Sequence, residues 1–314
     1  IKMALSHKQQ GNLIMLFVIL IFGLNIPINK YMFAEGLLSP VAMTALRMSF
    51  AAIAFWVVSL FLPKEKVAKK DMLLLLAGGL CGMVFNQGLF AYGLGQTSPV
   101  DASIITTSSP LFAMLIAAIV LKEPITWMKA GGVVVGGAGA IFLVYTSHHG
   151  EVQDGNMTGN LAIVGAQFFY AFYLVITRPL SERYSSVTMM KWMFLFASMA
   201  ALPFFYNEVL IAPLFQQADI TPFLLLAFTL VGATFITYFL IPFAQRRIRP
   251  TTISMYNNMQ PLIASGVAIY AGMDSFTLEK LIAGIFIFGG VYLVTKSKSK
   301  ADVELEVVEE KVKS

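Results

Sequence analysis

The chain has 314 residues, of which 57% are hydrophobic and only 12% are charged, and its net charge is +5 at pH 7. A soluble domain carries about 25% charged residues, so this composition excludes an ordinary water-soluble fold and predicts a protein embedded in lipid. The single cysteine, Cys81, excludes a disulfide within the chain and a cysteine-based metal cluster. The positive charge is spread through loops, which excludes a nucleic-acid-binding patch.

Ten segments are long and apolar enough to cross a bilayer, which needs about 20 mostly apolar helical residues. Only a short polar stretch separates the third segment from the fourth, and we place the boundary at Pro99 because proline suits the first turn of a helix. In chain order the expected spans are 12–33, 41–62, 72–95, 99–121, 127–146, 159–177, 187–206, 221–243, 250–271 and 279–295.

The positive charges test this count of spans. With ten spans, nearly all lysines and arginines fall on the side of the N-terminus, and only Lys30 and Lys280 fall in segments on the other side. Such an excess is typical of cytoplasmic segments. We therefore expect an all-α, multi-pass protein of the plasma (inner) membrane with both termini in the cytoplasm.

One sequence pattern occurs twice along the chain. Pro99, Pro110 and Thr126 match Pro250, Pro261 and Thr277 at an offset of 151 residues, and Gly11-Asn12-Leu13 recurs as Gly159-Asn160-Leu161 at an offset of 148. Because five spans separate the copies, the second half is expected to be inverted, as in many secondary transporters. The expected division is a cytoplasmic N-terminus (1–11), a first five-helix repeat (12–146), an extracytoplasmic connection (147–158), a second repeat (159–296) and a mobile charged cytoplasmic tail (297–314).

Polar side chains at bilayer depth are costly and usually face the protein interior. The fourth span has Thr106 and Ser109 just before Pro110, and the ninth has Tyr256, Asn257 and Gln260 just before Pro261. At the offset of 151, Thr106 matches Asn257 and Ser109 matches Gln260. The functional interpretation is a substrate-binding wall contributed by both repeats, and the alternative is ordinary hydrogen bonding between helices.

Other spans contribute amide and aromatic side chains that suit a zwitterionic or partly apolar solute. They are Asn25, Asn86, Gln87, Phe90, Gln167, Tyr170, Tyr173, Thr234 and Tyr238. For each of them, packing or anchoring at the membrane interface is the alternative. For Arg47, inside the second span, we favour carbonyl bonding or gating over direct contact with a solute. Compliant points for a conformational change are Gly23, Pro27, Pro110, Pro242 and Pro261.

Several of these residues also carry a resemblance to a known family. The motifs are Phe22-Gly23-Leu24-Asn25, Ser39-Pro40 with Arg47, Asn86-Gln87-Gly88-Leu89-Phe90-Ala91-Tyr92-Gly93-Leu94, Thr97-Ser98-Pro99-Val100-Asp101-Ala102-Ser103-Ile104, Pro110-Leu111-Phe112, Leu121-Lys122-Glu123, Gly131-Gly132 and Gly139. In these motifs the chain resembles EamA-type transporters of the drug/metabolite transporter superfamily, although Phe22 stands where that family commonly has tryptophan. The resemblance implies export or exchange of amino acids and other small metabolites.

The missing features narrow the function further. Every Asp and Glu lies at a span end, in a loop or in the tail, which disfavours direct proton coupling through an intramembrane carboxylate. All three histidines lie outside the spans, so an enzyme has no candidate acid–base pair, and the polar residues do not form the continuous stripe that a channel needs. We expect a carrier without cofactor or metal, whose partners are a small-molecule solute and the bilayer and which requires no oligomeric partner. Drug or toxic-compound efflux is the alternative substrate class.

Overall fold

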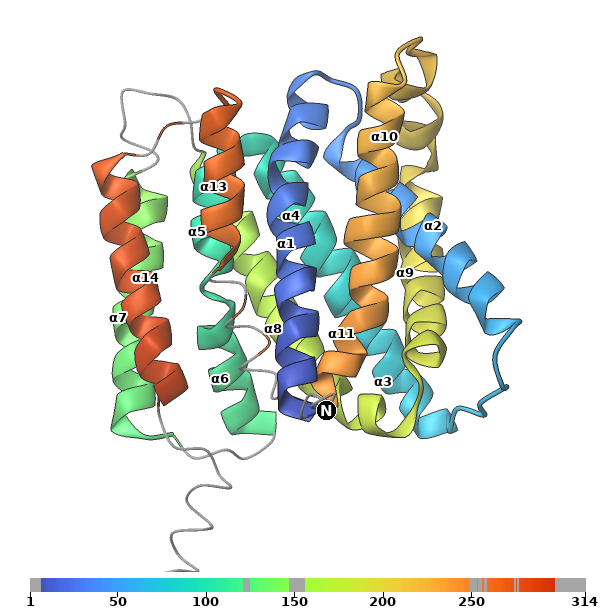
Figure 1. Ribbon diagram of the computed structural model, residues 1–314, viewed down its shortest axis with the longest axis horizontal. Helices are drawn as coiled ribbons and strands as arrows, with labels where there is room; N and C mark the ends of the chain where they lie inside the picture. The colour runs from blue at the N-terminus through green and yellow to red at the C-terminus, as the bar shows by residue number, and fades with distance from the viewer. Residues whose placement is uncertain are drawn as a thin grey trace, which may run out of the picture.

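The computed structural model describes residues 7–120, 125–146, 156–248, 259–273 and 277–296, together with residues 253, 256 and 275. All regular structure in these residues is helical (Figure 1). The α-helices are α1 (His7–Ala34), α2 (Pro40–Ser59), α3 (Lys69–Gly79), α4 (Asn86–Gln96), α5 (Pro99–Thr106), α6 (Ser109–Val120), α7 (Trp127–Thr146), α8 (Met157–Arg183), α9 (Ser186–Leu210), α10 (Thr221–Ala227), α11 (Thr237–Gln245), α13 (Gln260–Tyr270) and α14 (Leu278–Lys296). The π-helices η1 (Leu80–Phe85) and η3 (Phe228–Ile236) and the 3-10 helix η2 (Pro213–Gln216) complete the elements.

Within the described residues, 7 mainly helical segments are long and apolar enough to cross a membrane. They are Gln9–Ala34, Pro40–Ser59, Lys69–Gln96, Pro99–Val120, Met157–Arg183, Ser186–Gln216 and Thr221–Gln245, and they overlap the expected spans one to four and six to eight. Helices α7 and α14 overlap the fifth and tenth spans, and α13 covers the second part of the ninth. The protein is thus a polytopic, all-helical membrane protein, while the number of ten spans stays a prediction.

Serine side chains determine where several of these helices begin. The hydroxyl groups of Ser39, Ser98 and Ser185 accept a hydrogen bond from a backbone N–H in the first turn of α2, α5 and α9. Such a cap satisfies one of the N–H groups that have no partner inside the helix. In α2 and α5 the serine is followed by proline, which lacks an N–H that would be unpaired at this position. The Ser-Pro pairs therefore explain why the second and fourth segments begin within one residue of the expected positions.

Helices from the two halves of the chain pack in matching pairs. Helix α2 packs against α9, and α7 packs against α14. Helix α8 packs against α4, α5 and α6, while α1 packs against α11 and α13. In Figure 1, α7 and α14 lie side by side at one edge of the bundle, α2 and α9 lie at the other edge, and α1 lies between them. We call the end of the bundle at which α1 begins the lower end and the opposite end the upper end (Figure 1).

The α7–α14 pair depends on glycine. A Cβ atom placed on Gly290 of α14 would overlap backbone atoms of Gly132 and Gly136 in α7, and one placed on Gly139 would lie 2.7 Å from the Cβ of Phe286. Small residues let helix backbones approach closely in membranes, where association depends on packing. The glycines of α7 and α14 thus determine how closely these two helices meet.

Two long segments contain a π-helix, and the two π-helices lie at equivalent positions in the two halves of the chain. η1 joins α3 to α4 and η3 joins α10 to α11, and the two begin at Leu80 and Phe228, 148 residues apart. This is also the offset of the repeated Gly-Asn-Leu sequence. A π-helix changes the hydrogen-bond register of the backbone and often occurs at functional sites. Here, carbonyl groups in both π-helices accept hydrogen bonds from side chains of the other half or of another helix, as described below.

The fourth segment is interrupted in the middle. α5 ends at Thr106 and α6 begins at Ser109, and the N–H groups of Thr107 and Ser108 bond to carbonyls three residues earlier in a tight final turn. Proline has no N–H and its ring clashes with the preceding turn, so Pro110 explains this break. Helix α13 begins at Gln260, the match of Ser109 at offset 151, so in both halves a helix restarts one residue before a proline.

Candidate functional site

A cavity of about 520 Å³, counted to its open mouth, lies between the two halves of the chain. Its lining residues are Phe22, Asn25, Ile26, Arg47, Asn86, Gln87, Phe90, Thr106, Gln167, Tyr170, Tyr238 and Gln260. Asn25, Gln167 and Tyr170 lie well inside long helices, which places the cavity at mid-depth in the bundle. Among the described residues that line the cavity there is one cation, Arg47, and no acidic residue. Among the described residues, no group of three or more His, Cys, Asp and Glu side chains is placed to hold a metal ion.

The aromatic residues of the cavity come from equivalent positions in the two halves. Phe22 and Tyr170 are 148 residues apart, as are Phe90 and Tyr238, and all four side chains line the cavity. The rings of Phe22 and Tyr238 are in edge contact, with centroids 6.3 Å apart. The Tyr170 hydroxyl is buried and has no hydrogen-bond partner in the described structure. The rings offer an apolar surface, and the Tyr170 hydroxyl is open to a polar group of a solute.

Arg47 of α2 is 5% exposed, and two of its nitrogens bond to the η3 π-helix. Its Nε donates to Oγ1 of Thr234 at 2.8 Å, and its Nη2 donates to the carbonyl of Ala233 at 3.2 Å. Both acceptors are neutral. The carbonyl bonding expected from the sequence is present, but the same side chain also lines the cavity.

A chain of polar contacts continues from Arg47 through η3 to α1, which also lines the cavity. The hydroxyl of Thr234 donates to the carbonyl of Thr229 at 2.8 Å. The hydroxyl of Thr229 lies 2.8 Å from Oδ1 of Asn25 and 3.1 Å from Oδ1 of Asn29 in α1. Because these groups are buried, the contacts fix η3 relative to both α1 and α2.

The opposite wall is built by α4 and α8. Asn86 donates through Nδ2 to the carbonyl of Ala166 in α8 at 2.9 Å. Gln87 is buried beside the hydroxyl of Tyr238, but its amide makes no hydrogen bond of ordinary geometry. That hydroxyl donates to the carbonyl of Gly82 in η1 at 3.3 Å. Each π-helix thus supplies a carbonyl to a cavity residue from elsewhere in the chain.

The structure brings most of the predicted substrate-binding residues together. Those that line the cavity are Asn25, Asn86, Phe90, Thr106, Gln167, Tyr170, Tyr238 and Gln260. Ser109 is fully buried at the start of α6 but does not line the cavity, and Tyr256 packs against the apolar core instead. Asn257 lies outside the described residues. Their role in binding a solute stays a prediction.

The glycine and prolines that we expect to permit a conformational change lie at different kinds of position in the helices. Gly23 lies where α1 meets α13, because a Cβ atom there would come within 2.7 Å of the Ile263 Cβ. Pro27 and Pro242 lie inside α1 and α11, Pro110 follows the break between α5 and α6, and Pro261 is in the first turn of α13. None of these placements tests a hinge motion.

Phe22 and Ile26 line the cavity although the sequence analysis did not propose them as binding residues, and Arg47 lines it although it was assigned to carbonyl bonding or gating. Phe22 lies three residues before Asn25 and four before Ile26 in α1, so its side chain shares a helix face with each of them. The helical spacing from Phe22 to Asn25 and Ile26 would have identified this face. Thr229 and Asn29, which link the walls, were also not singled out.

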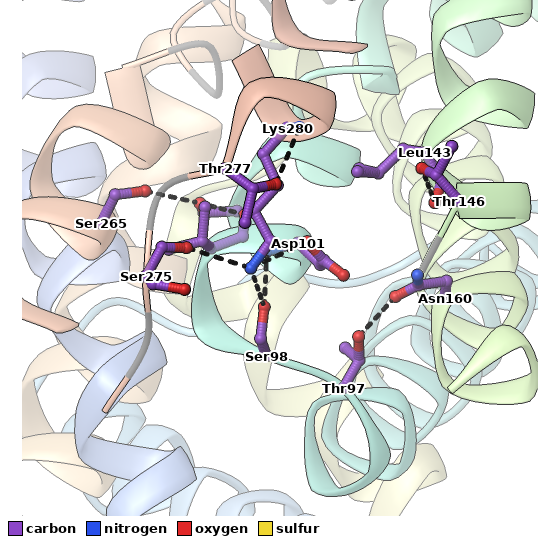
Figure 2. Close-up of polar contacts among 12 residues, drawn as sticks. Thr97, Ser98, Asp101, Leu143, Thr146, Asn160, Ser265, Ser275, Thr277 and Lys280 are labelled. Carbon is purple, nitrogen blue, oxygen red and sulfur yellow. Dashed lines mark hydrogen bonds and ion pairs between the residues drawn. The ribbon is translucent and has the colours of Figure 1, made fainter. Parts of the chain in front are cut away.

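A buried ion pair joins the two halves at the upper end. Lys280 of α14 places Nζ 3.6 Å from Oδ1 of Asp101 in α5, 3.4 Å from Oγ of Ser98 and 3.2 Å from the carbonyl of Ser275 (Figure 2). Asp101 is only 1% exposed. Asp101 thus lies at a span end, in the first turn of α5, and there it is buried beside Lys280 and not exposed to solvent.

A second lysine binds the same turn. Nζ of Lys30 in α1 donates to the carbonyls of Leu94 and Gly95 at 3.1 and 3.4 Å. Leu94, Gly95, Ser98 and Asp101 all belong to the connection between α4 and α5, which we call the α4–α5 turn (residues 94–101). The two lysines that the sequence places away from the positively charged side thus both hold this turn.

The lower end has its own polar contacts between α8 and its neighbours. Arg183 donates from Nη1 to both carboxylate oxygens of Asp71 at 3.0 and 2.8 Å. Arg246, at the end of α11, donates to the carbonyls of Ser181 and Tyr184. Gln245 donates to the carbonyl of Leu174 at 3.2 Å. These contacts attach α11 and α3 to α8.

Glu65, in the loop after α2, binds the start of α9. Its carboxylate accepts hydrogen bonds from the N–H and hydroxyl of Ser185. Slight burial raises the pKa of Glu65, but hydrogen bonds from Thr188 and Ser185, together with the charge of Arg246, outweigh this effect and hold its pKa below the ordinary value of 4.5.

The chain is similar in sequence to a known protein family and to several of its relatives. The sequence profile of the EamA-like transporter family matches residues 9–145 and 157–296. A WAT1-related protein of Arabidopsis thaliana is 27% identical over 316 residues, which cover 90% of this chain and 82% of that protein. An S-adenosylmethionine uptake transporter of Rickettsia bellii is 24% identical, over 70% of this chain and 71% of that protein.

Two further similarities are informative. A protein of Streptantibioticus cattleyicolor named "Probable terminal-alkyne amino-acid exporter" is 25% identical over 45% of this chain and 46% of that protein. A crystal structure with 17% sequence identity superposes with a TM-score of 0.63, covering 92% of this chain and 96% of that chain. The structural similarity shows a shared fold.

Proposed function

We infer that the chain, which belongs to the EamA-like transporter family of the drug/metabolite transporter superfamily, exports or exchanges small metabolites across the plasma (inner) membrane as a secondary transporter. The observation that carries this proposal is the cavity at mid-depth, because its polar and aromatic walls come from both halves of the chain. Secondary transporters bind their solute at such a place, between two repeats.

Amino acids and related compounds are the solute class that we propose. Amide side chains such as Asn25, Asn86 and Gln167 can bind a charged head group, and the rings of Phe22 and Phe90 can hold an apolar side chain. Two relatives are named for solutes with an α-amino carboxylate group, a terminal-alkyne amino acid and S-adenosylmethionine. The lining is thus compatible with the chemical group that these two names share.

We propose that the two halves are inverted repeats that move relative to each other. Three observations support this proposal. Exchanging helices for their counterparts leaves the pairs α2 with α9 and α7 with α14 unchanged, and it converts α8 with α4 into α1 with α11. The π-helices recur 148 residues apart, and the aromatic pairs of the cavity have the same offset. The family profile also matches two blocks of similar length.

Alternating access requires contacts that close each end of the cavity in turn. At the upper end, Lys30 and Lys280 bind the α4–α5 turn. At the lower end, Gln245 and Arg246 bind α8. We propose that these two sets of contacts break alternately, and that the glycine and proline positions at Gly23, Pro27, Pro110, Pro242 and Pro261 absorb the change in backbone shape.

Reconstituted transport tests the function. Purified protein in liposomes should exchange a labelled amino acid from a mixed panel at a rate that saturates with concentration. Replacement of Gln260 or Asn86 by alanine should raise the apparent KM by about 5- to 30-fold, because a hydrogen bond to a charged group contributes about 1–2 kcal/mol.

The matched control is Gln217→Ala, since Gln217 is an exposed amide outside the cavity. Its transport should equal that of the unmodified protein. Transport by both cavity variants with unchanged kinetics would remove the cavity as the binding site. Fluxes that do not saturate would indicate a channel.

A further inference from the structure

The charge of the cavity is not balanced by the protein. Arg47 is the only charged residue in the lining, and no carboxylate in the described part of the chain forms an ion pair with it. Its observed partners are the Thr234 hydroxyl and the Ala233 carbonyl, which are neutral. A charge at bilayer depth is costly and is usually paired or placed against water. The charge of Arg47 therefore favours an anionic group in the cavity.

The geometry of the guanidinium leaves one particular edge open. A guanidinium is planar, and its N–H groups form forks that match the two oxygens of a carboxylate. In Arg47 the fork formed by Nε and Nη2 is used by Thr234 and Ala233 of η3. Within the part of the chain that the structure describes, Nη1 makes no hydrogen bond, so the fork formed by Nη1 and Nη2 is available for a ligand. The π-helix thus holds the side chain by one edge and leaves the other for a ligand.

The remainder of the described lining offers only neutral partners to a positively charged group. Asn25, Asn86 and Gln167 offer amide oxygens, and Tyr170 and Phe90 offer aromatic faces. These groups can contact the ammonium of a zwitterion, but each is neutral. A solute whose only charge is positive would meet Arg47 without any compensating anion. The lining should thus favour solutes that carry a negative charge over solutes whose only charge is positive.

We propose that Arg47 binds the carboxylate of the transported solute and that the cavity selects carboxylate-bearing solutes over solutes whose only charge is positive. This inference rests on the transport function proposed above. Arg47 is then a specificity-determining residue. The Thr234 hydroxyl and the Ala233 carbonyl position it.

The first experiment uses the unmodified protein and two matched sets of probes. One set is L-phenylalanine, 3-phenylpropanoate and 2-phenylethylamine, and the other is L-leucine, 4-methylpentanoate and 3-methylbutylamine. In each set the second compound lacks the amino group and the third lacks the carboxylate. Binding to detergent-purified protein is measured by calorimetry, and competition with a labelled amino acid is measured in liposomes. We expect the deaminated acids to bind and compete within about tenfold of the amino acids and the amines to do neither.

The second experiment separates recognition from folding. Arg47→Gln should raise the Kd and apparent KM for the acids by about 10- to 100-fold, the usual value of a hydrogen-bonded charge pair, and should abolish the preference over the amines. Arg47→Lys should raise the Kd and apparent KM less than Arg47→Gln does, because lysine keeps the positive charge. Some affinity should still be lost, because lysine lacks the fork of N–H groups. The control, Arg178→Gln, removes an arginine that pairs with Glu182 outside the cavity, and should leave the preference unchanged.

The outcomes distinguish this inference from the proposed transport function. Transport of amino acids with equal competition by acids and amines would overturn the role of Arg47 and leave the transport function standing. If Arg47→Gln does not fold, the probe preference of the unmodified protein decides alone. If the unmodified protein neither binds nor transports any of the six compounds, the proposed amino-acid solute class fails and the role of Arg47 fails with it.

Discussion

Two buried cations of this protein are stabilised in different ways. Lys280 is 6% exposed and lies beside the carboxylate of Asp101, whereas Arg47 is 5% exposed and is bonded to a hydroxyl and a carbonyl. A lysine ammonium is compact and strongly hydrated, so burial demands a strong partner, while the delocalised charge of arginine tolerates neutral acceptors. A charge held in this way can still bind an anion, which is why Arg47 rather than Lys280 suits the recognition of a solute.

The close contact between the backbones of α7 and α14 leads to a prediction for Gly290. Gly290→Ala should destabilise the protein by about 1–3 kcal/mol, because the new methyl group overlaps the α7 backbone at Gly132 and Gly136 and neither backbone can move freely. The neighbouring substitution Gly289→Ala is the matched control, since nothing lies within 4 Å of its added methyl group. Thermal unfolding of both variants in detergent measures the difference. Equal Tm values would show that α7 and α14 are not in this contact.

Most polar residues of the cavity were predictable from the sequence, whereas two of its apolar residues, Phe22 and Ile26, were not. Asn25, Asn86 and Gln167 stand out because lipid excludes amide groups from apolar spans. Phe22 and Ile26 do not stand out, because an apolar side chain in a span is equally suited to lipid and to a cavity wall. Ser109 is the opposite case, since its polar side chain is buried in the bundle and is not part of the described cavity lining.

At the scale of whole elements, the α4–α5 turn is held by three helices. Helix α1 contributes Lys30, α14 contributes Lys280, and α8 contributes Asn160, which accepts a hydrogen bond from Thr97 at 2.6 Å (Figure 2). Lys30 and Asn160 belong to opposite halves of the chain. A relative movement of the halves would therefore change the contacts that Asn160 and Lys280 make with this turn.

Removal of Lys280 tests how strongly α14 holds this turn. Lys280→Met should destabilise the protein by about 3–5 kcal/mol, because Asp101 is left buried without its charged partner. The double variant Lys280→Met with Asp101→Asn should recover much of the loss, since no buried charge then remains unpaired. Thermal unfolding of the single and double variants measures this coupling.

Lys66→Met is the control for the loss of a lysine, because Lys66 is exposed in the loop after α2. Its stability should match that of the unmodified protein. Additive effects of the Lys280 and Asp101 substitutions would show that the two side chains do not form a pair.

Element boundaries and element types differ in how far the sequence determines them. The break before Pro110 and the start of α2 at Pro40 follow from proline chemistry, which the sequence shows directly. The π-helices η1 and η3 do not, because a change of hydrogen-bond register over one turn leaves no distinct pattern of apolar residues. They depend on tertiary contacts such as those from Tyr238 to Gly82 and from Arg47 to Ala233.

At the scale of the whole molecule, the two ends of the bundle differ in charge. The lower loop between α2 and α3 carries Lys64 and Lys66, whereas the upper connections at 35–39 and 211–220 contain no lysine or arginine. The two lysines near the upper end bind the α4–α5 turn instead of lying in a loop. The difference in positive charge between the lower and upper loops is therefore larger than a count over the sequence indicates. Lys30 and Lys280, the two lysines counted at the upper end, bind the turn and are not loop charges.

This asymmetry predicts the orientation of the protein in the membrane. Positively charged loops remain in the cytoplasm, so the lower end should be cytoplasmic and the upper end should face outward. In a Cys81→Ala background, Gln217→Cys should react with a membrane-impermeant maleimide added to intact cells, and Lys66→Cys should react only after the membrane is opened. Both positions are exposed, so a failure to react reports sidedness and not burial. Reaction of both from outside would contradict the parity of the spans, and the reverse pattern would place the Lys30 and Lys280 contacts on the cytoplasmic side.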